Sequence, residues 1–142
     1  MKKYLFSLLV IVTFSGACKK ENNTPTAPAM DRVDTTAKVK YTGNFENGPY
    51  GTVSGKAKLL MKDGKYTLVL DSVNISNGPD LHVYLSKEVL PINFIDLGKL
   101  KSISGTQVYD ITGTVDFTQY KYALVHCQLF DHLFGSAKLF LN

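Results

Sequence analysis

The 142-residue chain carries 16 Lys and Arg against 12 Asp and Glu, a formal net charge of +4. No stretch combines clustered basic residues with aromatic ones, so the composition argues against nucleic acid as a partner. No Gly-rich phosphate loop, HExxH pair or CxxC pair occurs in the sequence, which leaves a hydrolase without support.

Residues 1–17 have the organisation of an export signal. Two lysines supply a positive start, and Leu5 to Phe14 is an apolar run too short to span a bilayer as a stable helix. Ser-Gly-Ala then leads directly into Cys18, which resembles the lipobox cut by lipoprotein signal peptidase. We therefore expect Cys18 to be acylated, with membrane lipid as its partner. The mature chain would be an extracytoplasmic, membrane-anchored bacterial lipoprotein that faces the periplasm or the cell surface. An ordinary secretory signal cut just before Cys18 is the alternative.

Residues 18–37 have the composition of a flexible tether. This segment is rich in Asn, Thr and Pro and has almost no large apolar side chain before Val33. It therefore cannot bury enough surface to offset the entropy cost of ordering. Residues 38–142 are long enough to form one domain with a single core.

Apolar residues of this domain alternate in short runs separated by Gly, Pro, Asn and Asp, which predicts β-strands throughout. In chain order, we expect strands over residues 40–45, 56–62, 66–70, 81–86, 107–111, 120–129 and 136–141. Asp63-Gly64 supplies the positive φ angles of a tight hairpin turn between the expected strands at 56–62 and 66–70. About seven to eight short strands predict an all-β fold, an antiparallel β-sandwich or flattened barrel.

A second turn, Asn77 to Asp80, precedes the strand at residues 81–86. In that strand Leu, Val and Leu alternate with His82, Tyr84 and a serine, so the two sets face opposite sides of the sheet. Asp80, His82 and Tyr84 are the candidate ligand-binding residues here. Tyr84 could also join two other tyrosines, at positions 109 and 122, in an aromatic patch for a partner or for electron hopping. The simpler interpretations are a turn-stabilising aspartate, half-exposed surface histidines and tyrosines that serve packing.

Cys127 is the only thiol left in the mature domain once the other cysteine is assigned to lipid, so no intramolecular disulfide can form. Period-two alternation places Ala123, Val125, Cys127 and Leu129 on one apolar face and His126 on the other. Cys127 is therefore either a core thiol that acts as a small hydrophobe or a thiol poised to react.

Four sequence blocks together resemble the DM-thirteen domain, over about Gly43 to Leu139. The blocks are NGPDLHVYLS at 77–86, DLGKLK at 96–101 with GTQVY at 105–109, VHCQLF at 125–130, and FGSAKL at 134–139. This resemblance implies an electron-transfer domain in which Cys127 is the redox residue. Two positions depart from the family pattern. His126 stands where the family usually has Trp, and no histidine precedes the Ser54-Gly55 pair.

Copper is the alternative cofactor, because Cys127, His132 and His82 resemble the ligands of azurin-like blue-copper proteins. The axial methionine of such a site is missing, and Ser136 stands at its position. The strand pattern also turns His82 away from the apolar face of its strand. The sequence otherwise identifies no cofactor.

The leading functional expectation is electron transfer or redox sensing through Cys127, with a redox partner in the cell envelope. Such a protein would be an electron carrier and not an enzyme. The competing class is a non-enzymatic binding or adhesion module at the envelope.

Replacing the proposed anchor tests the lipoprotein interpretation. In a Cys18→Ala variant, metabolic palmitate labelling should disappear and an unprocessed or mis-sorted precursor should accumulate, because the acylated sulfur is gone. Palmitate labelling that persists in this variant would show that Cys18 is not the anchor.

Overall fold

The computed structural model describes residues 23–142, which form ten strands and no helix. The strands are β1 (Ala29–Met30), β2 (Lys38–Asn47), β3 (Val53–Lys62), β4 (Lys65–Ile75), β5 (Leu81–Ser86), β6 (Phe94–Lys99), β7 (Ser104–Ile111), β8 (Tyr122–Cys127), β9 (His132–Lys138) and β10 (Phe140–Leu141). Within this range the structure has no helix with the length and hydropathy needed to cross a bilayer. The expected signal peptide and Cys18 lie outside the described residues.

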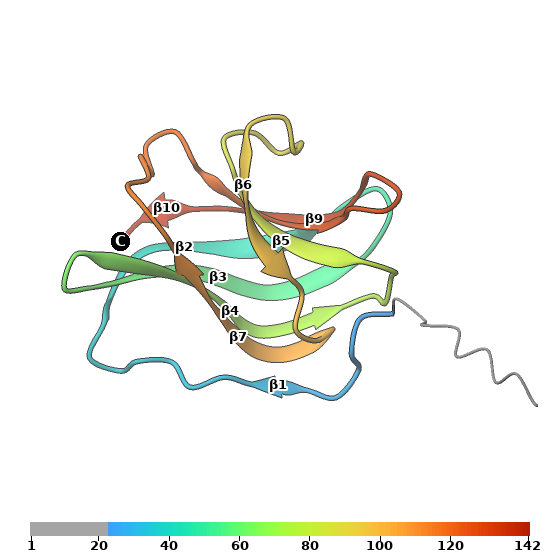
Figure 1. The fold of residues 1–142 in the computed structure, drawn as a ribbon, viewed down its shortest axis with the longest axis horizontal. Coiled ribbons are helices and arrows are strands. Elements are labelled where there is room, and N and C mark those ends of the chain that lie inside the picture. Colours follow the sequence, from blue (N-terminus) through green and yellow to red (C-terminus); the bar gives the residue numbers. More distant parts are fainter. Residues whose placement is uncertain (1–22) are drawn as a thin grey trace, which may run out of the picture.

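The strands form one strongly curled sheet, a half-barrel (Figure 1). The order across it is β1-β7-β4-β3-β2-β9-β8-β5-β6, and β10 pairs with β2. All pairs are antiparallel except β1 with β7. The predicted all-β fold of the sandwich or flattened-barrel kind is confirmed, with slightly more strands than expected.

The β3–β4 hairpin follows the sequence pattern closely. Asp63 and Gly64 both have positive φ, 50° and 75°, as a tight hairpin turn requires. Ala57 and Leu59 are fully buried on the inner face of β3. Strand β6 was not anticipated, because Gly98 and a proline-containing loop interrupt any alternating pattern there.

A buried polar network fixes the segment between β6 and β7. Gln107 is fully buried, and its Oε1 accepts hydrogen bonds from Lys101 N at 3.0 Å and from the Tyr109 hydroxyl at 2.8 Å. Its Nε2 donates to Ser102 O at 2.7 Å. Because a buried amide without partners is costly, this network determines how the chain crosses from the β5–β6 half of the sheet to β7.

The described part of the expected tether, residues 23–37, lies along the sheet. Ala29 and Met30 pair with β7, and Ser102 Oγ donates to Ala27 O at 2.6 Å. Gly105 makes the pairing possible, because a Cβ at that position would lie 2.0 Å from Ala29 O. Backbone atoms of the segment make the strand pairing and accept the Ser102 hydrogen bond, so a composition that argues for flexibility does not reveal these contacts.

Candidate functional site

The site is built on the pairing of β5 with β8. The register sets Leu81 opposite Cys127 and His82 opposite His126. Residues directly opposite each other in an antiparallel pair share a face. Cys127 therefore faces the core together with Leu81, and the two histidines face the other side. All six residues of β5 are buried, so both faces of this strand pair are covered.

Cys127 ends β8 and is 1% exposed. Its Sγ donates a hydrogen bond to Pro79 O at 2.8 Å, which requires the sulfur to carry its proton. Ala123 and Val125 are buried on the same face, as predicted. The prediction for Leu129 is wrong: β8 stops at Cys127, and Leu129 lies in the following turn with 57% of its surface exposed.

The Asn77–Asp80 turn covers the thiol, and contacts from two sides hold its backbone in place. Thr24 Oγ1 donates to Gly78 O at 3.1 Å, and Asn23 forms an isolated bridge with Pro79. On the other side, Gln128 N donates to Asp80 O at 3.0 Å. The cover over Cys127 is thus held partly by the first residues of the described chain.

The opposite face of the strand pair carries two buried histidines. His82 is 7% exposed and His126 is 3% exposed, so the expectation that they are half-exposed surface residues is wrong. His82 Nδ1 lies 3.0 Å from Asp96 Oδ2, and its Nε2 lies 3.4 Å from Asp80 Oδ1. His126 Nε2 lies 3.1 Å from Asp131 Oδ1. Three carboxylates, each from a different part of the chain, therefore surround the histidine pair.

The surroundings of this site lower the pKa of Asp80 and of His126 for different reasons. Lys99 donates a hydrogen bond to Asp80 and is the largest cause of the lowered pKa of that carboxyl, so Asp80 is ionised at neutral pH. Burial lowers the pKa of His126, and the neighbouring Asp131 only partly opposes this effect. Among the described residues, His126 Nδ1 has no hydrogen-bond partner. At neutral pH we therefore expect His126 to be an uncharged imidazole.

Tyr84 fills the space between the histidines and β6. It is 1% exposed, and its ring stacks on Phe94 with a centroid distance of 4.2 Å and on His126 at 5.3 Å. Burial raises the pKa of the Tyr84 phenol. Tyr122 packs in the same small cluster, whereas Tyr109 belongs to the main core, so the expected patch contains two of the three tyrosines.

The copper ligands proposed from the sequence do not converge. Cys127 faces the core, His82 lies on the opposite face, and the His132 ring stacks on Tyr50 with a centroid distance of 3.8 Å. Across residues 23–142 no group of three or more His, Cys, Asp or Glu side chains is placed to hold a metal ion. The residues present therefore do not fit a blue-copper centre.

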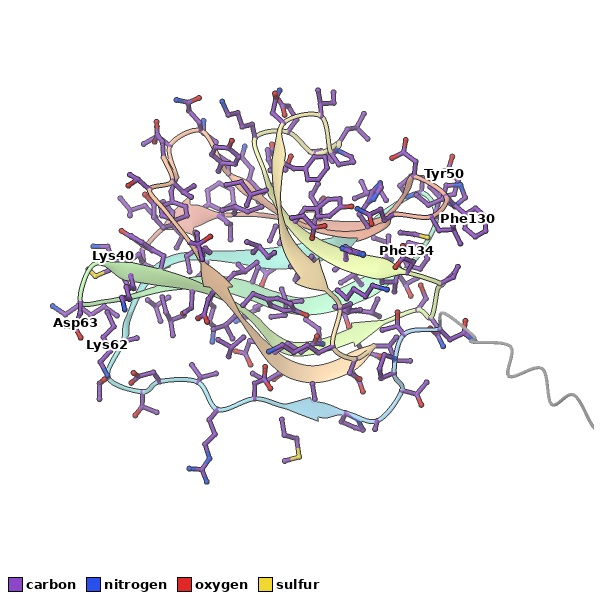
Figure 2. The ribbon with its side chains drawn as sticks, viewed as in Figure 1. Lys40, Tyr50, Lys62, Asp63, Phe130 and Phe134 are labelled. Carbon is purple, nitrogen blue, oxygen red and sulfur yellow. The ribbon has the colours of Figure 1, made fainter. Side chains whose placement is uncertain are left out.

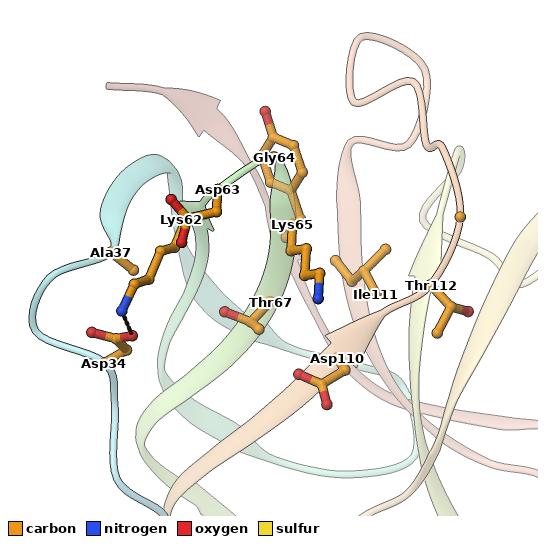
Figure 3. Close-up of a pocket in the computed structure, with 12 residues that line it drawn as sticks. Asp34, Ala37, Lys62, Asp63, Gly64, Lys65, Thr67, Asp110, Ile111 and Thr112 are labelled. Atoms are coloured by element: carbon orange, nitrogen blue, oxygen red, sulfur yellow. Dashed lines mark hydrogen bonds and ion pairs between the residues drawn. The ribbon is translucent and has the colours of Figure 1, made fainter.

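A pocket of about 670 Å³ lies beside the β3–β4 hairpin (Figure 3). Its walls include Lys65, Asp110 and the ion pair between Lys62 and Asp34, with 2.7 Å between Nζ and Oδ2. Figure 2 shows Lys62 and Asp63 at one end of the molecule and Phe134, which adjoins the Asn77–Asp80 turn, at the other. The pocket is thus remote from Cys127.

The curled sheet and its one described thiol define the class of protein, an all-β domain with a single-cysteine site. A family model described as "Electron transfer DM13" matches residues 44–139, and the chain belongs to this family. Searches of the curated proteins and of the solved structures found no match.

The depressed pKa of His126 predicts a dependence of stability on pH. The unfolded chain binds a proton at this imidazole near the ordinary pKa of about 6.5, more readily than the folded chain does. The free energy of unfolding should therefore fall from about pH 7.5 to about pH 5, above the range in which carboxylates titrate. The slope from one group is at most about 1.4 kcal/mol per pH unit.

Urea unfolding followed by circular dichroism measures this loss. A His126→Gln variant should lose less stability over the same interval than the wild type, whereas a control His132→Gln variant, which keeps the His126 imidazole, should still lose stability as the pH falls. An unchanged loss in the His126→Gln variant would show that His126 is not the group responsible.

Proposed function

We propose that this protein is an envelope lipoprotein whose domain transfers electrons through Cys127. Membership of the electron-transfer family supports the role, and the lipobox-like sequence before Cys18 supports the anchor. The observation that carries the assignment to Cys127 is its position. The one described thiol ends a strand directly under a short turn, and the N-terminal segment helps to hold that turn.

A single thiol limits the chemistry to exchange with a partner. In thiol–disulfide exchange, the Cys127 thiolate forms a bond with one sulfur of a partner disulfide, and the bond between the two partner sulfurs breaks. The second partner sulfur leaves as a thiolate that carries the electron pair. A peroxide can instead oxidise the thiolate to a sulfenate, with loss of water or an alcohol.

Either reaction requires the thiol to be uncovered. Opening the Asn77–Asp80 turn would break the Cys127–Pro79 and Thr24–Gly78 hydrogen bonds and leave the β3–β4 part of the sheet intact. Local openings of this kind cost less free energy than global unfolding. We infer that the turn acts as a cover that opens for the redox partner.

The competing function is a binding module in which Cys127 is a permanent core residue. The 1% exposure of the thiol and its satisfied hydrogen bond favour this second function. The two functions differ in how quickly a reagent reaches the thiol in the folded protein.

Native-state alkylation of Cys127 by N-ethylmaleimide, measured by mass spectrometry on the full-length protein, separates them. Alkylation should proceed faster than global unfolding, and a Thr24→Val change should accelerate it by roughly 2- to 10-fold, because one hydrogen bond of about 0.5–1.5 kcal/mol is lost from the cover. Peroxide should give a sulfenic acid that dimedone traps at Cys127 and that is missing in Cys127→Ser.

Thr36→Val is the matched control. Thr36 bonds to Asp34 in the same N-terminal segment, but its hydrogen bonds do not involve the turn over Cys127. This variant should alkylate at the wild-type rate. If alkylation matches the rate of global unfolding in all three proteins and dimedone traps nothing, the electron-transfer role of Cys127 fails and the binding module becomes the better assignment.

A further inference from the structure

Three loops meet at the end of the sheet where Cys127 lies. They join β2 to β3 (residues 48–52), β4 to β5 (residues 76–80) and β8 to β9 (residues 128–131). The strand registers bring their ends together, since Asn47 pairs with Gly135, Val53 with Ile75 and Leu81 with Cys127. We call this part of the molecule the thiol end.

The thiol end exposes a cluster of large apolar side chains. Tyr50, Leu129 and Phe130 are each 57% exposed, and we call them the loop patch. Figure 2 shows Tyr50 and Phe130 close together at this end, beside Phe134. The rings of Tyr50 and Phe130 both contact the His132 ring, with centroid distances of 3.8 Å and 5.9 Å. Contiguous exposed apolar side chains are a common feature of interaction surfaces.

Backbone hydrogen bonds hold the loop that carries Tyr50 in place. Gly48 N donates to Phe134 O at 2.7 Å, and Tyr50 N donates to Leu133 O at 3.3 Å. The second loop packs closely as well, because a Cβ at Gly78 would lie 2.6 Å from the Phe134 ring. The Tyr50 side chain therefore projects from a loop that backbone hydrogen bonds hold in place.

Charge is sparse at the thiol end. The three loops contain no Lys or Arg, and their charged side chains are Asp80 and Asp131. Asp80 is paired with Lys99, whose Nζ lies 3.1 Å from Asp80 Oδ1. Asp131 lies 3.1 Å from His126 Nε2, which is expected to be uncharged, so Asp131 keeps an exposed charge. The labelled lysines in Figure 2, Lys40 and Lys62, lie at the opposite end. Moving the thiol end out of water therefore costs less free energy than moving the opposite, lysine-containing end out of water.

The chain enters the described domain at the thiol end. Asn23 bridges to Pro79, beside the carbonyl that accepts the Cys127 hydrogen bond. Five residue steps separate Asn23 from Cys18 and can span at most about 18 Å. In contrast, the ten-residue strand β3 alone extends about 33 Å from this end toward the hairpin. An acyl chain on Cys18 would therefore keep the thiol end, and not the hairpin end, near the lipid.

From this placement we propose that the loop patch docks on the surface of the bilayer that holds the lipid anchor. The proposal rests on the anchored lipoprotein of the proposed function and adds an orientation to it. Tyr50, Leu129 and Phe130 would enter the interfacial layer, where amphipathic aromatic side chains are favoured. The cover over Cys127 would then open toward the membrane, so its redox partner would be reached at the bilayer surface.

The sequence contains no tryptophan, so a single introduced one reports its own surroundings. The test uses the full-length acylated protein in phosphatidylcholine vesicles, with and without bromine on the acyl chains. A Phe130→Trp variant should show blue-shifted emission and a several-fold loss of fluorescence to the bromines. Leu129→Trp provides a second reporter in the patch. Phe140→Trp, at a site 61% exposed on β10, is the control and should be quenched little.

Flotation with the vesicles distinguishes a failure of the docking surface from a failure of the lipid anchor. If the acylated variants float and the tryptophans at 129 and 130 are quenched no more than the one at 140, the docking surface is wrong and the anchor stands. If the proteins do not float, the anchor itself fails and the orientation fails with it. Flotation together with strong quenching only at 129 and 130 supports the proposal.

Discussion

The register between β5 and β8 is the constraint on which the other features of the site depend. It places Leu81 opposite Cys127 and His82 opposite His126, so the thiol and the imidazoles lie on opposite faces of one strand pair. A slip of one residue would exchange the two sets. Burial of all six β5 residues disfavours such a slip, because it would move polar imidazoles into the main core.

Each face of this strand pair has its own cover. The curl of the sheet closes the inner face, and the buried amide of Gln107 fixes the segment that completes the curl. Tyr84 and three carboxylates enclose the histidines on the outer face. The turn over Cys127 is a third cover, and Thr24 joins it to the N-terminal segment. The covered thiol and the point where the chain enters the described domain thus lie at the same end.

Much of the fold could be predicted from the sequence because most strands have one buried face and hence a period of two. The inner-face position of Cys127 followed from the same rule. The burial of His82 and His126 did not, since alternation within one strand cannot show that both faces are covered. Their carboxylate partners come from three separate places in the chain, and part of the docking of residues 23–37 depends on backbone pairing that side-chain composition does not show.

The central claim is that the turn over Cys127 opens while the rest of the sheet stays folded. Native-state hydrogen exchange tests it most directly, because the Gln128 amide donates to Asp80 O and is released when the turn opens. We expect this amide to exchange with a lower opening free energy than the amides of the β3–β4 ladder and with little dependence on denaturant. Exchange of Gln128 with the same free energy and the same denaturant dependence as that ladder would contradict the claim.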